Sequence, residues 1–379
     1  MRALARRGLL PLLLCLGAAR GVRLNQRATA GRRQSGPNCW ARCAQRGAGN
    51  ESRQCPFAQF FEGKYWGWRG LHACGAEDLR VEVSCEGLPR SSFAEEVRRQ
   101  LGGKHVVMIG DSTMRQSYLG LLCLLWEEGL VGNIAPRAKE NNEHLHHYEW
   151  KGFINGSFPE LGEGTELTYI RKDWGEPGPF MRAILDTADV TVANLGMHYK
   201  FPRGRIRHTT TDDQVVHAST YGQDVTTLIK EVLERGRPGH RAFWRETFTC
   251  AAYATDAKPN TSYGCSREGN AYQAEFNQVV SSLPAYGDIA VLRTQDLLGE
   301  FWWAHPGGHD CCHLVGSVPG LLSGVSRLLV AHLAFGQGQL GAEAAATSAA
   351  TALARGPSCP ALAAVCESAP LDLWKGPGP

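Results

Sequence analysis

Short apolar runs alternate along the chain with longer segments whose apolar residues recur every three or four positions. Four of the runs have the length of strands, at residues 104–110, 189–196, 241–248 and 288–293. Four of the longer segments have helical spacing, at residues 116–128, 225–235, 271–283 and 320–333. Because strands alternate with helices, the pattern predicts a three-layer α/β fold with a doubly wound, mostly parallel sheet.

The first residues differ from this pattern. Met1–Ala19 combine early arginines, a short apolar run and small residues suited to cleavage, which is typical of a signal peptide. A membrane-spanning helix needs about 20 apolar residues, and no run in the chain reaches that length. We therefore expect a luminal or secreted protein, with a short uncleaved anchor as the open alternative.

Composition divides the rest of the chain into four parts. Residues 20–37 are polar and rich in arginine and glycine, which predicts a flexible linker. Residues 38–100 concentrate cysteine, glycine and aromatic residues, and they predict a disulfide-stapled N-terminal subdomain. Residues 101–335 carry the alternating strands and helices and are expected to form the main α/β domain. Residues 336–379 are rich in alanine and glycine, and we interpret them as a C-terminal tail.

Cysteine content and charge narrow the class of protein. The chain has 13 cysteines, and removal of Cys15 with the signal peptide leaves an even number, as expected in an oxidising compartment. Three glycosylation sequons, at Asn50, Asn155 and Asn260, fit exposed luminal loops. The formal net charge of +3 is spread among interspersed acids and bases, which argues against nucleic acid as the partner.

The sequence Gly110-Asp111-Ser112 ends an apolar, β-branched run and precedes a predicted helix. This order places the Ser112 hydroxyl on a strand-to-helix turn, where the backbone N–H groups of a helix N-terminus point at a bound group. The alternative is that Ser112 only caps the helix. Asp111 is expected to bond the turn. Arg115, about one helical turn later, is a candidate for binding an anion, although a solvated surface arginine is the commoner case.

A second group lies far downstream, where Asp310 and His313 supply an acid and an imidazole three residues apart. With Ser112 they make a nucleophile, a base and a group that orients the base, as acyl transfer requires. The alternatives are a surface capping pair and a zinc site formed by the histidines of residues 305–313. Because Pro306 and the glycines after it break any helix there, and because the neighbouring cysteines are assigned to disulfides, we expect no metal.

Asn194 and Gly196 end the predicted strand at 189–196. In a parallel sheet they lie on the same edge as Ser112, where an Asn amide and a Gly N–H can complete an oxyanion hole with the Ser112 N–H. The alternative is an ordinary turn.

Several local sequences together resemble the trichome birefringence-like (PC-esterase) proteins of the SGNH/GDSL superfamily. They are Cys85-Glu86-Gly87-Leu88-Pro89-Arg90, Gly110-Asp111-Ser112-Thr113-Met114-Arg115, Asn194-Leu195-Gly196-Met197-His198-Tyr199, Phe243-Trp244-Arg245-Glu246-Thr247 and Asp310-Cys311-Cys312-His313. The ordered set extends over roughly residues 55–330 and is far more specific than any one piece. The sequence departs from the family pattern at Leu314-Val315, where a Trp-Cys pair is usual.

The resemblance implies an SGNH-type O-acetyltransferase, or a related esterase, acting on polysaccharide hydroxyls in the Golgi lumen. It implies Ser112 as nucleophile, His313 as base and Asp310 as its orienting acid, with Asn194 and Gly196 near the oxyanion. We also expect Gly110 and Arg115 to belong to the residues that bind the oxyanion or the substrate. The expected partners are an acyl donor and a glycan acceptor, without a further cofactor, metal or nucleic acid; the sequence leaves the oligomeric state open.

The resemblance also suggests a disulfide from Cys123 to the N-terminal subdomain, and Cys265 with Cys311 is the next expected pair. Adjacent Cys311 and Cys312 are not expected to bond to each other. Two other functions stay open: a carbohydrate esterase that uses the same three residues with water as acceptor, and a glycan-binding protein without catalysis.

Overall fold

The structure is a computed structural model of the chain. It describes residues 37, 39–45, 55, 57, 79–88, 90–130, 145–148, 153–196, 199, 218–247, 276–298, 301, 313–314 and 320–335. Within these ranges no helix has the length and apolar character needed to cross a bilayer. Among the predicted site residues, only Asp310 lies outside the described residues.

A seven-stranded, mostly parallel sheet forms the centre of the described residues, in the order β4-β5-β6-β3-β7-β8-β9. Its strands are β3 (His105–Gly110), β4 (Leu145–Tyr148), β5 (Phe153–Ser157), β6 (Glu166–Arg171), β7 (Val190–Ala193), β8 (Arg241–Arg245) and β9 (Ala290–Leu292). Strands β6, β3, β7, β8 and β9 run parallel, and β4 and β5 pair antiparallel at one edge. The predicted α/β class and all four predicted strands are therefore confirmed, each strand within shorter bounds.

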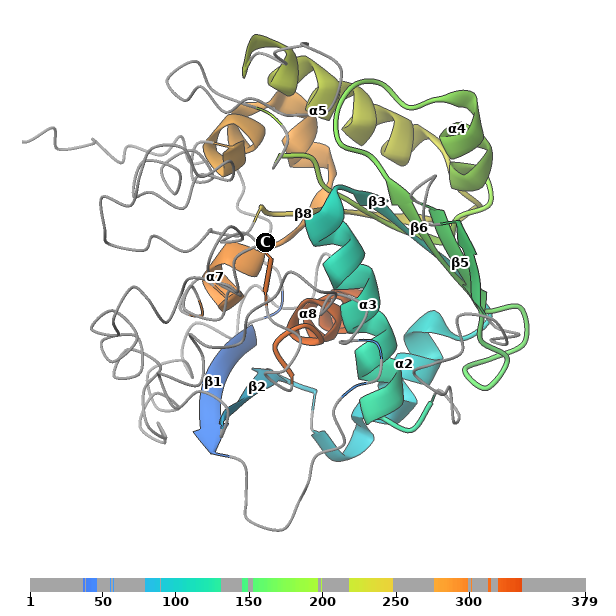
Figure 1. The fold of residues 1–379 in the computed structure, drawn as a ribbon, viewed down its shortest axis with the longest axis vertical. Helices are drawn as coiled ribbons and strands as arrows, with labels where there is room; N and C mark the ends of the chain where they lie inside the picture. The colour runs from blue at the N-terminus through green and yellow to red at the C-terminus, as the bar shows by residue number, and fades with distance from the viewer. Residues whose placement is uncertain are drawn as a thin grey trace, which may run out of the picture. The chain divides into compact units, whose positions relative to one another are not determined.

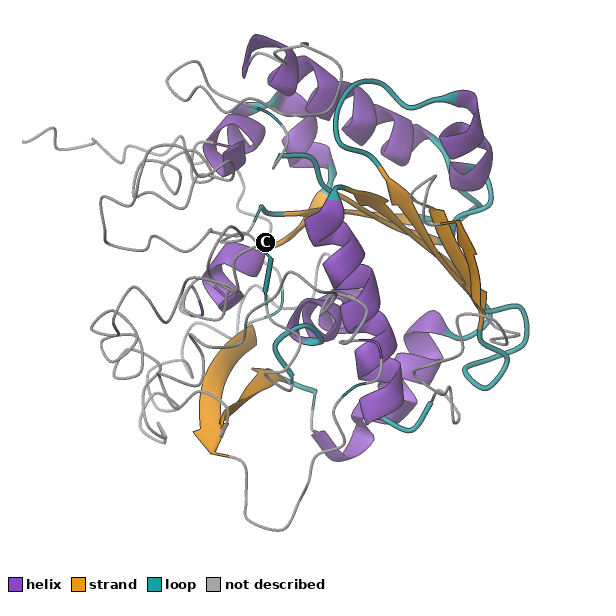
Figure 2. Ribbon diagram, viewed as in Figure 1, coloured by secondary structure: helices purple, strands orange, loops and turns teal. Residues whose placement is uncertain are grey.

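Helices cover both faces of the sheet (Figures 1 and 2). On one side lie α2 (Phe93–Leu101), α3 (Ser112–Glu127) and α8 (Gly324–Phe335), and on the other lie α4 (Pro179–Leu185), α5 (Ala218–Glu234) and the helical residues 276–282. Because side chains alternate along a strand, Val106 and Met108 of β3 join the first core cluster, whereas Val107 and Ile109 join the second. The six-residue strand β3 is buried on both faces, as the apolar run that follows His105 predicts.

The sequence pattern missed the strands at the antiparallel edge. Strand β5 contains Asn155, which we expected in an exposed glycosylated loop; this expectation is wrong for Asn155. Its side chain is half-buried, and its Oδ1 accepts a hydrogen bond from Thr168 Oγ1 of β6 at 2.8 Å. A polar residue satisfied across two strands interrupts the apolar alternation, so this part of the sheet is not visible from hydrophobicity alone. Asn50 and Asn260 lie outside the described residues.

A separate two-stranded sheet consists of β1 (Cys39–Gln45) and β2 (Leu79–Cys85), paired antiparallel (Figure 2). A disulfide joins Cys39 to Cys85, the residues paired at one end of the ladder. Strand β2 approaches the segment before α8 so closely that a Cβ at Gly320, where φ is +80°, would overlap the Val81 carbonyl. Strands β1 and β2 therefore pack on the same core as α3 and α8.

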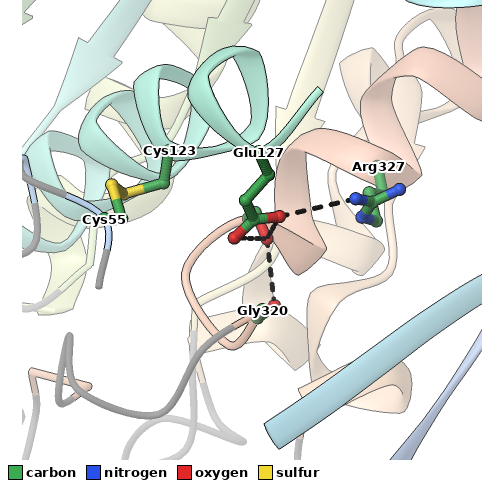
Figure 3. The surroundings of a disulfide bond; sticks show 6 residues. Cys55, Cys123, Glu127, Gly320 and Arg327 are labelled. Carbon is green, nitrogen blue, oxygen red and sulfur yellow. Dashed lines mark hydrogen bonds and ion pairs between the residues drawn. A yellow bond between two sulfur atoms is a disulfide. The ribbon is translucent and has the colours of Figure 1, made fainter. Parts of the chain in front are cut away.

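Helix α3 is fixed near its C-terminal end by two side-chain contacts (Figure 3). Cys123 forms a disulfide with Cys55, which confirms the predicted tie to the N-terminal subdomain. Four residues later, the Glu127 carboxylate accepts from Ser323 Oγ at 3.1 Å and pairs with Arg327 at 3.4 Å. Burial raises the pKa of Glu127, and the charge of Arg327 opposes that shift. The expected Cys265–Cys311 disulfide lies outside the described residues.

Candidate active site

Ser112 is the first residue of α3, directly after the turn that ends β3. The buried Asp111 caps the helix, because its Oδ1 accepts from the Thr113 N–H at 2.8 Å and from Thr113 Oγ1 at 2.7 Å. This confirms that Asp111 bonds the turn. The Asp111 carbonyl accepts the N–H groups of Met114 and Arg115. The N–H of Ser112 takes no part in these contacts.

Gly110 allows three elements to meet beside the nucleophile. A Cβ at this position would lie 2.7 Å from Asn194 O of the β7 end and 2.8 Å from Met114 Cβ of α3. Any larger residue would push the strand end away from the helix. Tyr169 of β6 also contacts the turn, since its hydroxyl proton is shared between Asp111 O at 3.0 Å and Gly110 O at 3.2 Å.

The structure brings His313 to Ser112. His313 Nε2 lies 2.7 Å from Ser112 Oγ, although 201 positions separate the two residues in the sequence. With the ring proton on Nδ1, Nε2 accepts the serine O–H, which is the arrangement of a general base and its nucleophile. Asp310, the predicted orienting acid, lies outside the described residues, so its role stays a prediction.

Sequence reasoning missed Gln116, which also binds the segment of His313. The Gln116 side chain, 1% exposed, donates from Nε2 to Leu314 O at 2.6 Å and accepts the Leu314 N–H on Oε1 at 2.9 Å. A signal was present: Gln116 is a polar residue four positions after Ser112 on the same helix, and residues at this spacing share one face.

A buried guanidinium lies beneath the nucleophile turn. Arg245, the last residue of β8, is 0% exposed. Its Nη2 donates to Thr113 Oγ1 at 2.7 Å and to Asn194 Oδ1 at 2.9 Å, and its Nη1 donates to Ser117 Oγ at 3.3 Å. Burial lowers the pKa of Arg245 to about 10, while the negative charge of Asp111 opposes this shift. Arg245 therefore stays charged at neutral pH and ties the start of α3 to the ends of β7 and β8.

Asn194 belongs to the same network. Besides accepting from Arg245, its Nδ2 donates to Arg245 O at 2.9 Å and to Thr247 Oγ1 at 3.1 Å, so both amide hydrogens are used. The side chain is fully buried. This geometry makes Asn194 a residue that positions the strand ends, and its predicted contact with an oxyanion stays a prediction.

Gly196 lies three residues after the end of β7, and Arg115 lies three residues after Ser112 on α3. A Cβ at Gly196 would lie 2.6 Å from Thr247 Oγ1, so a larger residue would displace the Thr247 hydroxyl that accepts from Asn194 Nδ2. Arg115 is half-buried, and its positive charge acts on Tyr169. The predicted oxyanion contact of Gly196 and the predicted anion contact of Arg115 are compatible with these positions and stay predictions.

A loop after β6 borders the nucleophile turn. The Lys172 N–H donates to Gly110 O at 2.8 Å, and the Gly175 N–H donates to Tyr199 Oη at 3.0 Å. Trp174, between them, is 41% exposed. Sequence reasoning placed no functional residue in this loop, because β6 was not predicted. The described residues contain no group of three or more His, Cys, Asp or Glu side chains arranged to hold a metal.

Comparison with known proteins assigns no family. No protein-family model matches the chain, and no curated protein matches it. The resemblance to the PC-esterase family therefore rests on the short motifs alone.

Proposed function

We propose that the protein is a serine-dependent O-acyltransferase that moves an acetyl group to the hydroxyl of a glycan. The observation that supports this proposal is the 2.7 Å contact between Ser112 Oγ and His313 Nε2, at the carboxyl edge of a parallel sheet. Ligand sites of open α/β sheets lie at this edge. The glycan acceptor and the acetyl group follow from the motif resemblance.

The first half-reaction forms an ester on the enzyme. Ser112 Oγ attacks the carbonyl carbon of the acyl donor while His313 Nε2 takes the hydroxyl proton. The bond from the carbonyl carbon to the donor's leaving group then breaks, and His313 returns the proton to that group. The Ser112 N–H, at the positive end of α3, is directed at the developing oxyanion in this proposal.

The second half-reaction reverses these steps with a glycan hydroxyl. His313 takes the acceptor's proton, the acceptor oxygen attacks the acyl carbon, and the bond to Ser112 Oγ breaks as the serine recovers its proton. Asp310 would orient His313 and stabilise its charged form. The disulfides fit an oxidising compartment, and we propose the Golgi lumen or the cell exterior as the location.

Trapping of the intermediate tests the proposal. Purified protein is incubated with an activated acetyl ester and a panel of glycans, and the acetyl group is located by mass spectrometry. We expect label on Ser112, no label at that position in Ser112→Ala, and a loss of about 10²–10⁴-fold in His313→Ala, as for removal of a general base. Asp310→Asn should lose less, since it removes no reacting group. The Ser112/His313 double variant should be little worse than either single variant.

The exposed Ser84 of β2 offers a matched control, and Ser84→Ala should react like the wild type. Acyl transfer to water without transfer to any glycan would identify an esterase. Glycan binding without any label on Ser112 would favour the non-catalytic function and refute the serine mechanism.

A further inference from the structure

Gln116 connects the candidate base to the helix that carries the nucleophile. Ser112 and Gln116 are four residues apart on α3, so both side chains lie on one face. One face therefore makes two contacts with residues 313–314: Ser112 Oγ with His313 Nε2 at 2.7 Å, and the Gln116 amide with the Leu314 backbone at 2.6 and 2.9 Å. Gln116 and Leu314 are 198 positions apart in the sequence.

The Gln116 contact is specific to an amide. Leu314 offers one N–H and one carbonyl, and an amide side chain supplies the complementary acceptor and donor. Gln116 and Leu314 are both buried, at 1% and 5% exposure. A buried polar group is costly when it is not hydrogen-bonded, so an apolar side chain would leave both Leu314 groups unsatisfied. An ionised carboxylate would face the Leu314 carbonyl with a second acceptor.

The contact fixes the backbone directly beside His313. With both polar groups of Leu314 bound and its side chain in the core, the preceding residue, His313, cannot move along or away from α3 without breaking these bonds. We propose that Gln116 is a positioning residue that holds His313 Nε2 within hydrogen-bonding distance of Ser112. This inference deepens the proposed function and rests on it for its catalytic meaning.

The expected effect on the reaction is on turnover. Gln116→Met preserves much of the volume and removes both bonds, and a displacement of about 1 Å in a reacting group costs on the order of 10²-fold in rate. We expect kcat to fall by about 10–100-fold with little change in KM, because Gln116 makes its contacts with the protein backbone.

The geometry is tested without acyl transfer by placing a thiol at the nucleophile position. In a Ser112→Cys background, the nearby imidazole should hold the pKa of the introduced thiol below the ordinary value of about 8.5. Alkylation by iodoacetamide is followed against pH, and mass spectrometry identifies the modified peptide. Addition of Gln116→Met should raise the midpoint of this profile by about one pH unit or more.

Gln100→Met is the matched control, since Gln100 is a buried glutamine of α2 that donates to Glu96. It should leave the alkylation midpoint unchanged. Gln116→Glu gives a second comparison, because a protonated carboxyl offers the donor and the acceptor of an amide. The alkylation rate of Gln116→Glu, divided by that of the Ser112→Cys parent, should fall as pH rises and the carboxylate forms. This ratio tests the inference if Gln116→Met does not fold.

Two results overturn the inference: an unshifted midpoint in folded Gln116→Met, or a constant rate ratio across pH in Gln116→Glu. The proposed function fails separately. Absence of acyl transfer in the wild type, together with a shifted midpoint in Gln116→Met, would refute the transferase and retain the role of Gln116. Normal acyl transfer in the wild type, together with an unshifted midpoint in Gln116→Met, would retain the transferase and refute the role of Gln116.

Discussion

Substitution of Arg245 by methionine should destabilise the fold strongly. The change keeps an apolar stem and removes a charge that is 0% exposed. Two short hydrogen bonds are lost, from Nη2 to Thr113 Oγ1 at 2.7 Å and to Asn194 Oδ1 at 2.9 Å. The buried carboxylate of Asp111 also loses the positive charge that acts on it.

The magnitude follows from these losses. A hydrogen bond to a charged group contributes about 1.5–3 kcal/mol, and removal of one partner from a buried charge network costs about 3–5 kcal/mol. We therefore expect Arg245→Met to lower the free energy of unfolding by about 3–5 kcal/mol, a large part of the 5–15 kcal/mol typical of a domain. Arg245→Lys should recover only part of this, since an ammonium cannot reproduce the geometry of the guanidinium.

Arg241, at the other end of the same strand, is the matched control. It donates to the carbonyls of Leu333 and His332 at 2.6 Å each and is only half-buried. Water can replace the donors lost in Arg241→Met, so the expected cost is about 1 kcal/mol. Urea unfolding, followed by tryptophan fluorescence, measures both variants. Equal destabilisation by the two substitutions would refute the reasoning. It would show that removing the buried charge of Arg245 costs no more than removing the half-buried charge of Arg241.

Two further predictions concern stability. Replacement of Cys55 and Cys123 by alanine should cost about 4 kcal/mol, because their disulfide closes a loop with a sequence separation of 68; a midpoint of urea unfolding equal to that of the wild type would contradict this. Burial raises the pKa of Glu246 to about 7, so the native state holds this proton more tightly than the unfolded state, and stability falls as pH rises from about 4.5 to 7. Glu246→Gln should therefore be more stable than the wild type by about 1–3 kcal/mol at pH 8 and nearly equal to it at pH 4, and urea unfolding at the two pH values would disprove this if the difference did not change.

The sequence predicted β3, β7, β8 and β9 of the parallel part of the sheet and missed β6. Every position of β3 and β7 is buried, and in β3 the apolar run that follows His105 ends at the nucleophile turn. Strands β5 and β6 were missed because polar residues inside them are satisfied by one another, as Asn155 and Thr168 are. The hydrophobicity pattern of a sequence does not reveal such pairs of hydrogen-bonded polar residues.

The candidate site was predictable where a motif lies on a strand end and not where residues meet through the fold. Ser112 was found from the run before it, and His313 from its spacing to Asp310. Gln116 and Arg245 act on backbone or side chains more than 100 positions away. Their partners follow from the three-dimensional path of the chain, which local sequence does not specify.

The distance along the chain between Ser112 and His313 has a consequence for the order in which the site forms during folding. Ser112 and His313 are 201 positions apart, and closing so long a loop carries an entropic cost that other contacts must offset, so we expect this contact to form late in folding. Until that contact forms, the proposed nucleophile Ser112 lacks its proposed base. The proposed nucleophile becomes reactive when the segment that carries His313 docks on α3, so in this proposal the completion of folding is also the step that activates the enzyme.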